Sequence, residues 1–490
     1  MLTTEEIQRF IDEDISSEKK RLAAVGQRYY EGKHDILNCR LFYYNADGKL
    51  EEDMTRSNIK ICHPFFTEMS DQLSAYMLSF DENPIRACET ADGLQEKLDL
   101  YFDDDFWAEI GDLITGAYNK GFEYIYAYKN SENRLAFKCA DSMGVIEVRE
   151  EDTDDGCKYI IYWYIDRIEK GRKQIRRIQV WSDSETAYFV QDGASGTIEL
   201  DNSVENNPRY HVIYKDKKTG KRLGYGLGYI PFYRLDNNNK QISGLSAVKG
   251  LIDDYDLHAC SLSNNLVDFD TPLHVVSGYP GNDLNELQQN LKTKKIIGVD
   301  AEGDVQVRTI DVPYQARKEK LDLDEKNIYR FGFGFNSAQV GDGNVTNVVI
   351  RSRYTLLDLK ANKLEKRVRR LLREILKIVL AEINQEHKKD YQLSDIWFDF
   401  THNIMTNETE NIQNAKIEAE TKQIEINNIL NAAASIGDVE ALKAICAVLE
   451  LDYEEIQGEL KKQEESGLLG ARAALDAADV TEPTFQPEIA

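Results

Sequence analysis

The sequence has few of the residues that build disulfide-stapled or membrane-embedded folds. Its 490 residues include nine prolines and seven cysteines, and the cysteines form no C-x-x-C pair. Their odd number and wide spacing fit neither a disulfide framework nor a zinc site, so we expect reduced thiols. No run of eighteen apolar residues occurs, and acidic residues stand where a signal peptide needs a basic start. We therefore expect neither export nor a membrane partner.

Signatures of catalysis are also missing. The sequence contains no Walker loop, no H-E-x-x-H and no G-x-S-x-G, and its seven histidines are dispersed. The acidic clusters Asp103-Asp104-Asp105 and Asp253-Asp254 are candidates for the Mg²⁺ ligands of a nuclease. Adjacent carboxylates on a helix point in different directions, however, which favours a solvated face. We expect no enzyme, no catalytic or metal-binding residues and no cofactor.

Basic residues are in short supply. The chain has 86 acidic and 60 basic residues, a formal charge of −26, whereas proteins that hold duplex DNA use clustered Lys and Arg to neutralise phosphates. If DNA is a partner, we therefore expect it to move along the protein without being bound tightly. The 42% hydrophobic content, with 26 tyrosines and 18 phenylalanines, indicates a folded chain, and its length predicts two to four structural units.

The first half of the sequence predicts helices followed by antiparallel sheets. Thr3 and Glu6 form a capping box for a helix through about Ala24, and further helical patterns cover 63–79 and 92–117. From Phe122 to Tyr233 the period changes to that of strands, for example over 159–165 and 179–190. This order predicts an α+β fold.

The middle of the sequence predicts two helices that bracket a small insert. The first helix covers 245–269 and ends before Pro272, and the second begins near Pro313 and ends at Tyr329. Between them we expect strands at 273–276, 296–299 and 305–310 and a helix at 282–291. The insert is therefore expected to be a compact α/β module.

A glycine-punctuated loop and a very long helix follow. The loop, 331–346, offers polar residues, while the helix Asn347–His387 would be roughly 60 Å long at ~1.5 Å per residue. One stripe of this helix is an apolar heptad seam suited to packing against other helices. The neighbouring stripe is basic, although such a stripe is often only a solvated face. The loop residues are Asn336, Ser337, Gln339, Asp342 and Asn344; the seam includes Leu357, Leu364, Val368, Leu371 and Ile375; the basic stripe is Lys360, Lys363, Arg367, Arg370 and Lys377.

Several motifs, in this order, resemble the portal proteins of tailed phages, in particular those of siphophages of Gram-positive bacteria. They include Tyr29-Tyr30-Glu31-Gly32 near the start, Pro231-Phe232-Tyr233-Arg234-Leu235-Asp236 before the first bracketing helix, and Leu356-Leu357-Asp358-Leu359-Lys360-Ala361 on the long helix. The resemblance covers about 29–400.

The resemblance implies a portal fold: a sheet-rich wing, a two-helix stem, a small α/β clip, a long kinked helix and a helical crown. The implied boundaries are 1–242 for the wing, 243–270 for the first stem helix, 271–310 for the clip, 311–330 for the second stem helix, 331–346 for a tunnel loop, 347–403 for the long helix with a returning wing strand, 404–464 for the crown and 465–490 for a flexible tail.

The same resemblance implies a subunit of a ring, usually of twelve copies, at one vertex of a virion capsid, assembled in the cytoplasm of the bacterial host. The ring would conduct double-stranded DNA without sequence specificity during packaging and ejection. The five tunnel-loop residues named above would lie close to the DNA, and the apolar seam of the long helix would pack between subunits. Its implied partners are other copies of the chain, terminase, a head-tail adaptor, and capsid and scaffold proteins. The residues alone leave two alternatives open, a helical scaffolding or interaction protein and a metal-dependent nuclease.

Overall fold

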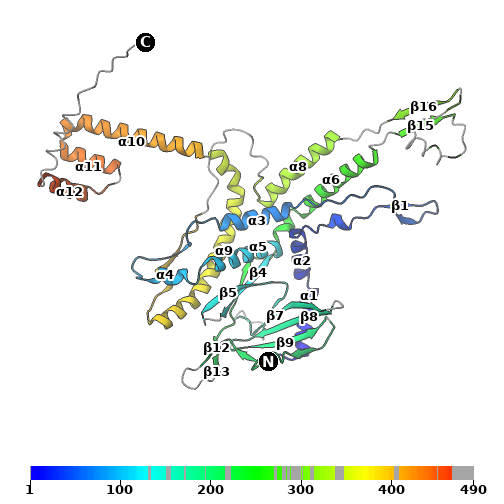
Figure 1. The fold of residues 1–490 in the computed structure, drawn as a ribbon, viewed down its shortest axis with the longest axis horizontal. Coiled ribbons are helices and arrows are strands. Elements are labelled where there is room, and N and C mark those ends of the chain that lie inside the picture. The colour runs from blue at the N-terminus through cyan, green and yellow to red at the C-terminus, as the bar shows by residue number, and fades with distance from the viewer. Residues whose placement is uncertain are drawn as a thin grey trace, which may run out of the picture. The chain divides into compact units, whose positions relative to one another are not determined.

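The computed structural model describes residues 2–130, 134–149, 156–169, 173–193, 195–215, 222–269, 273–278, 283, 287, 299–300, 302–308, 314–336, 347–401, 408–449 and 451–465 (Figure 1). Two units result. The first comprises Met1–Asp342 with Arg351–Ile404, and the second comprises Gly343–Ile350 with Met405–Ala490. All described strands and most of the helices belong to the first unit, so helix and sheet are mixed as expected.

The chain begins with two helices where one was predicted. The capping box of Thr3 and Glu6 is confirmed, and it starts α1 (Thr4–Ser16). The helix does not continue to Ala24, because the Ser17 side chain accepts a hydrogen bond from the Lys20 amide and begins α2 (Glu18–Tyr30). A serine at an N-cap satisfies a backbone donor that the helix leaves unpaired, which explains the break.

Three further helices contribute side chains to the main hydrophobic core. They are α3 (Phe65–Met77), α4 (Leu94–Asp99) and α5 (Asp104–Lys120), so the predicted helix over 92–117 is in fact two. Asp103 separates them by accepting a hydrogen bond from the Phe106 amide at 3.0 Å. Between α2 and α3 lie the short helix η1 (Asp35–Asn38) and the hairpin β1 (Phe42–Tyr44) and β2 (Leu50–Glu52), and β3 (Ile85–Ala87) precedes α4.

The sheets are antiparallel, as predicted. Of the two larger sheets, one has the strand order β14-β4-β5, and the other has the order β10-β9-β8-β7-β6 with β11 paired to β9. The predicted strand over 179–190 is the end of one strand and the start of the next. The strands are β4 (Phe122–Lys129), β5 (Leu135–Ala140), β6 (Val145–Val148), β7 (Tyr159–Glu169), β8 (Lys173–Trp181), β9 (Glu185–Asp192), β10 (Ile198–Leu200), β11 (Arg209–Tyr210), the hairpin β12 (Val212–Lys215) and β13 (Arg222–Tyr225), and β14 (Phe232–Asp236).

Two helices bracket a two-stranded hairpin, again as predicted. The helix η2 (Gly244–Ala247) leads into α6 (Lys249–Phe269), and α8 (Tyr314–Gly332) returns after β15 (Leu273–Ser277) and β16 (Asp304–Arg308). The helix expected at 282–291 and the strand at 296–299 fall almost wholly outside the described residues. The second bracketing helix ends at Gly332 rather than Tyr329, so it includes the first two residues of the predicted loop.

The long helix α9 (Asn347–His387) has the predicted bounds, and after η5 (Leu393–Asp395) the strand β17 (Ile396–Phe398) pairs with β3. The seam of α9, for which packing between subunits was predicted, is directed into the core of the chain itself. Its side chains are 0–4% exposed because they pack within the chain, in one core with residues of α3, α5 and β4. These buried seam residues are Leu357, Leu364, Val368, Leu371 and Ile375.

The second unit is helical, as predicted for 404–464. It contains α10 (Glu408–Ile436), α11 (Asp438–Val448) and α12 (Tyr453–Glu465), with Ala441 and Cys446 buried. The predicted flexible tail lies outside the described residues, apart from Glu465. In the part of the chain that the structure describes, no helix combines the length and apolar character needed to span a bilayer.

Candidate functional site at the end of α8

The segment that follows α8 is fitted closely to α3. A side chain at Gly332 would clash with the Met69 sulfur, and a Cβ at Gly334 would lie 2.7 Å from Met69 Cγ. Between these glycines Phe333 has a φ of 59°, a left-handed conformation that is uncommon for a residue with a side chain. The Phe-Gly repeat of the sequence therefore marks a tight turn on a packed surface, not only a flexible loop.

The side chain of Gln72 in α3 forms two hydrogen bonds with the backbone of Phe335. Its Oε1 accepts from the Phe335 amide at 3.0 Å, and its Nε2 donates to the Phe335 carbonyl at 2.8 Å. The Phe335 ring stacks on Tyr354 of α9, with 4.4 Å between ring centroids, although residues 337–346 between them lie outside the described residues. The two helices that flank the predicted tunnel loop are thus tied to α3 and to each other.

Lys360 makes a second tie between α9 and the end of α8. Its Nζ donates to the Gly332 carbonyl at 2.9 Å and lies 3.7 Å from the centroid of the fully buried Tyr118 ring. Burial lowers the pKa of Lys360 to about 7. The face of the Tyr118 ring and the carbonyl end of α8 both attract a cation, so they oppose part of this decrease in the pKa of Lys360.

Of the predicted tunnel-loop residues, Asn336 is described. Its Nδ2 donates to Glu325 Oε1 of α8 at 2.7 Å, which directs this amide back towards the helix. Ser337, Gln339, Asp342 and Asn344 lie outside the described residues. Their predicted contact with DNA remains a prediction.

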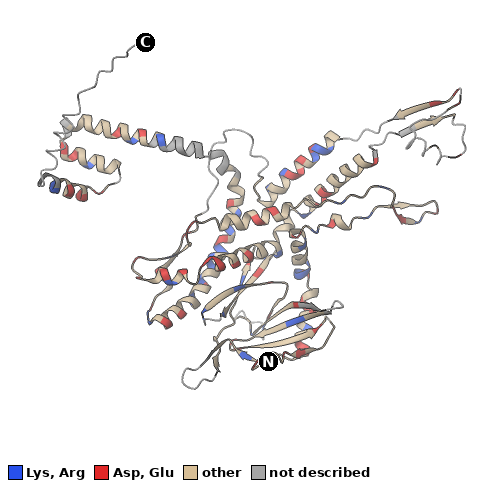
Figure 2. Cartoon of the chain, viewed as in Figure 1, with Lys and Arg blue, Asp and Glu red and all other residues tan. Residues whose placement is uncertain are grey.

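The structure does not keep the predicted basic stripe together as one surface. Lys360 is turned inward, and Lys377 pairs with Glu374 at 2.8 Å. Arg367 donates to the Asn239 side chain, while Lys363 and Arg370 are exposed. Figure 2 shows acidic residues interleaved with basic ones along α9. The exposed members of the stripe are therefore the candidates for phosphate contact.

The acidic clusters have structural partners. Asp103 caps α5, Asp253 accepts hydrogen bonds from Lys249 and Tyr29, and Asp254 pairs with Lys320 of α8. Among the described residues, no group of three or more His, Cys, Asp or Glu side chains is placed to hold a metal ion. All seven cysteines are free thiols, as expected.

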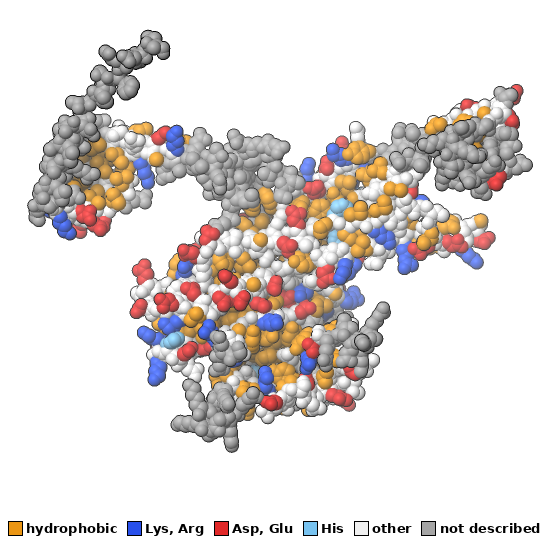
Figure 3. Space-filling model, in the orientation of Figure 1, with side chains coloured by type: hydrophobic (Ala, Val, Ile, Leu, Met, Phe, Trp, Pro, Cys, Tyr) orange, Lys and Arg blue, Asp and Glu red, His pale blue; other side chains and the backbone are white. Residues whose placement is uncertain are grey.

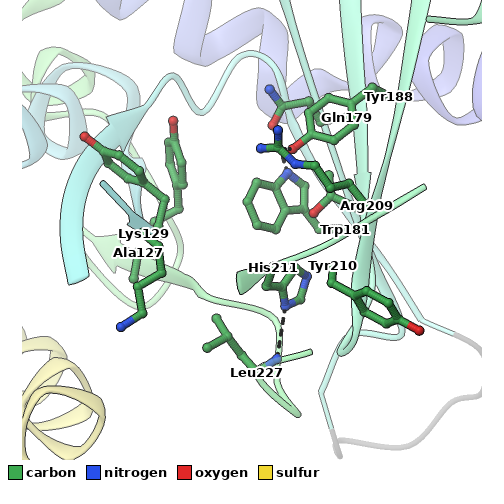
Figure 4. Close-up of a pocket in the computed structure, with 12 residues that line it drawn as sticks. Ala127, Lys129, Gln179, Trp181, Tyr188, Arg209, Tyr210, His211 and Leu227 are labelled. Carbon is green, nitrogen blue, oxygen red and sulfur yellow. Dashed lines mark hydrogen bonds between the residues drawn. The ribbon is translucent and has the colours of Figure 1, made fainter. Parts of the chain in front are cut away.

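A pocket that the sequence did not predict lies between the two larger sheets, that of β4 and that of β8 and β9 (Figure 4). Aromatic rings of Trp181 and Tyr188 line it together with Arg209, and His211 accepts a hydrogen bond from the Leu227 amide at 3.4 Å. Among the described residues, the lining contains no carboxylate.

Comparison with known proteins identifies the family. The model of the family described as phage portal protein, SPP1 Gp6-like, matches residues 9–466, so the chain belongs to this family and is a phage portal subunit. The portal protein of Bacillus phage SPP1 is 26% identical over 410 residues, which are 83% of this chain and 78% of that protein. The portal protein of Clostridium phage phiCD119 is 23% identical over 424 residues, which cover 83% of this chain and 87% of the relative.

Proposed function

We propose that this portal subunit forms a ring, of about twelve copies, at one vertex of a phage capsid, and that double-stranded DNA passes through the ring during packaging and ejection. The ring docks terminase during packaging and a head-tail adaptor afterwards, beside capsid and scaffold proteins. It makes and breaks no bond in DNA. The family match over 9–466 carries this proposal.

We assign the parts as follows. The antiparallel sheets with their helices form the wing, α6 and α8 the stem, and β15 with β16 the clip. Residues between α8 and α9 form the tunnel loop, and the second unit forms the crown. The order of these elements along the chain supports the assignment, and so does the anchoring of Gly332 and Phe335, because a loop held firmly at its base can present its tip at a fixed place.

The charge of the chain suits passage rather than binding. Twelve copies carry 12 × −26 = −312 formal charges, and an acidic wall repels phosphates. DNA then finds no groove that neutralises it along its length. Single exposed cations such as Lys363 and Arg370 would give weak, salt-dependent contacts only.

The ring is tested by native mass spectrometry of the purified chain, supported by negative-stain images. A closed assembly of about a dozen copies with a central hole is the expected result. A protein that stays monomeric or dimeric together with scaffold protein would contradict the ring and favour a scaffolding or interaction role. DNA cleavage in the presence of Mg²⁺ or Mn²⁺ would instead favour the alternative function, a metal-dependent nuclease.

The contact with DNA is tested separately. Lys363→Glu combined with Arg370→Glu should lower the amount of DNA packaged in a complementation assay, while rings still form. The matched control is Lys138→Glu, which changes an exposed lysine on β5. Equal packaging by the double variant and the control would remove these two residues from the DNA path.

A further inference from the structure

An extended segment is bonded in register along the first stem helix. Every second backbone amide of this strap, residues 57–63, donates to every fourth side chain of α6. Four α-helical residues rise ~6.0 Å and two extended residues ~6.6 Å, so the two repeats match over the length of the strap. The pairs are Ser57 with Asp268 at 3.2 Å, Ile59 with Asn264 at 2.7 Å, Ile61 with the Cys260 sulfur at 3.2 Å, and His63 with Asp256 at 3.0 Å.

Asp256 also fixes the other end of the same excursion of the chain. This carboxylate is completely buried, and it accepts hydrogen bonds from His34 Nδ1 at 2.6 Å and from His63 Nδ1 at 2.7 Å. The His34 ring stacks on Tyr29 with 4.5 Å between centroids. Residues 35–62 thus leave the core and return to it at one side chain of α6.

The hairpin of β1 and β2 at the end of this excursion has no core of its own. All six of its strand residues are exposed, and Tyr44 is 74% and Leu50 57% exposed; nearby Met54 is 84% exposed. We call residues 41–54 the arm. Figure 3 shows hydrophobic side chains at the surface of the arm and of the helices beside it. An isolated two-stranded hairpin is marginal in water, so an anchored arm with large apolar side chains is suited to pack on a partner.

The opposite side of α6 belongs to α8. Lys320 of α8 pairs with Asp254, and Asp254 lies about 160° around α6 from Asp256, at ~100° per residue. The first stem helix therefore stands between the strap and the second stem helix. In a head-to-tail ring, two different surfaces of the chain meet at each contact. The strap side and the α8 side are two such surfaces.

These two sides have complementary chemistry. Four carboxylates and one lysine occur in the arm, and Asp47 and Glu51 have no ion-pair partner among the described residues. From Leu323 onward, the exposed side chains of α8 are apolar or basic, and its two exposed cations likewise pair with no described carboxylate. These side chains are Leu323, Lys326, Arg330 and Phe331.

We propose that the arm is a clasp between copies of this chain, and that it docks on the exposed face of α8 in the neighbouring copy. This inference rests on the ring of the proposed function. The strap holds the arm to its own stem, so the clasp transfers a displacement of one stem directly to the next.

Photo-crosslinking of the assembled protein tests the clasp. A benzophenone amino acid in place of Tyr44 should join the arm to a peptide within 318–331 and yield dimers and larger species on a denaturing gel. The control places the same amino acid at Tyr210, an exposed tyrosine of β11. The Tyr210 protein should give no link to 318–331.

Charge exchange supplies a second measurement. Lys326→Glu with Arg330→Glu should lower the ring fraction at least tenfold at a fixed concentration, and the addition of Asp47→Lys with Glu51→Lys should restore it. Rings that form normally, with Tyr44 links confined to one chain or to other peptides, would refute the clasp and leave the ring intact. Absence of rings in the unmodified protein would overturn both.

Discussion

Replacing Lys360 by methionine should remove a pH-dependent part of the stability of the first unit. Methionine keeps an unbranched apolar side chain but cannot donate to the Gly332 carbonyl. In the folded protein burial lowers the pKa of Lys360 from 10.5 to about 7. Between these two values the unfolded chain binds more protons at this residue than the folded chain does, so the stability of the natural protein should rise with pH across that window.

The size of the effect follows from the same difference. The pKa falls by 10.5 − 7 = 3.5 units, and at ~1.36 kcal/mol per unit the upper limit is about 5 kcal/mol. The Tyr118 ring and the carbonyl end of α8 favour the ammonium by ~1 kcal/mol each. About 2–3 kcal/mol should therefore remain.

Urea unfolding at pH 7 and pH 10 measures this contribution, with tryptophan fluorescence as the probe because all four tryptophans lie in the first unit. The natural protein should gain more stability than Lys360→Met between the two pH values, and all other groups cancel in the difference. Lys363→Met, an exposed change on the same helix, is the control and should behave like the natural protein. An identical gain for all three proteins would refute the argument.

Three further changes test neighbouring contacts. Gln72→Ala removes two hydrogen bonds to the segment after α8, so amide exchange there should accelerate about tenfold, and unchanged exchange would contradict the clamp. Burial raises the pKa of Asp256, but hydrogen bonds from two histidines outweigh this effect and lower the pKa below 3.8. The ionised carboxylate should therefore contribute ~2 kcal/mol to the free energy of unfolding above pH 3.8. This contribution is lost as the pH falls through the pKa of the folded state. Asp256→Asn should accordingly lose stability at pH 7 and show a shallower acid transition, whereas superimposable acid transitions would exclude the role. Gly334→Ala presses a Cβ against Met69 and should cost ~1–3 kcal/mol, while Gly458→Ala, with open space around it, should cost nothing in thermal unfolding.

The sequence predicted the elements whose signals are local. The capping box at Thr3, the antiparallel strands and both bounds of α9 are confirmed because each depends on spacing within one segment. The same spacing could not show that Ser17 starts a new helix, since a serine is also tolerated inside one. Nor can a heptad seam distinguish the chain's own core from another subunit, because both bury the same apolar stripe.

The candidate site was only partly predictable. The glycines at 332 and 334 indicated an unusual backbone, but their role in fitting Met69 depends on tertiary packing. Gln72 contacts a residue 263 positions away in sequence, and no local pattern indicates such a pair. Lys360 was predicted as one of five equivalent surface cations, whereas its ammonium group is directed to the buried Tyr118 ring.

The burial of the seam constrains how copies can associate. With Leu357, Leu364 and Val368 inside the chain, the described side chains of α9 leave no long apolar stripe for a neighbour. Contacts in a ring must then use surfaces that remain exposed, such as the arm and the outer face of α8, which are small and of mixed polarity. Interfaces of this kind respond to salt and to charge reversal more strongly than a dry helical seam does. If the arm is the clasp, ring assembly should therefore weaken as ionic strength rises, whereas a seam-to-seam contact would strengthen or stay unchanged.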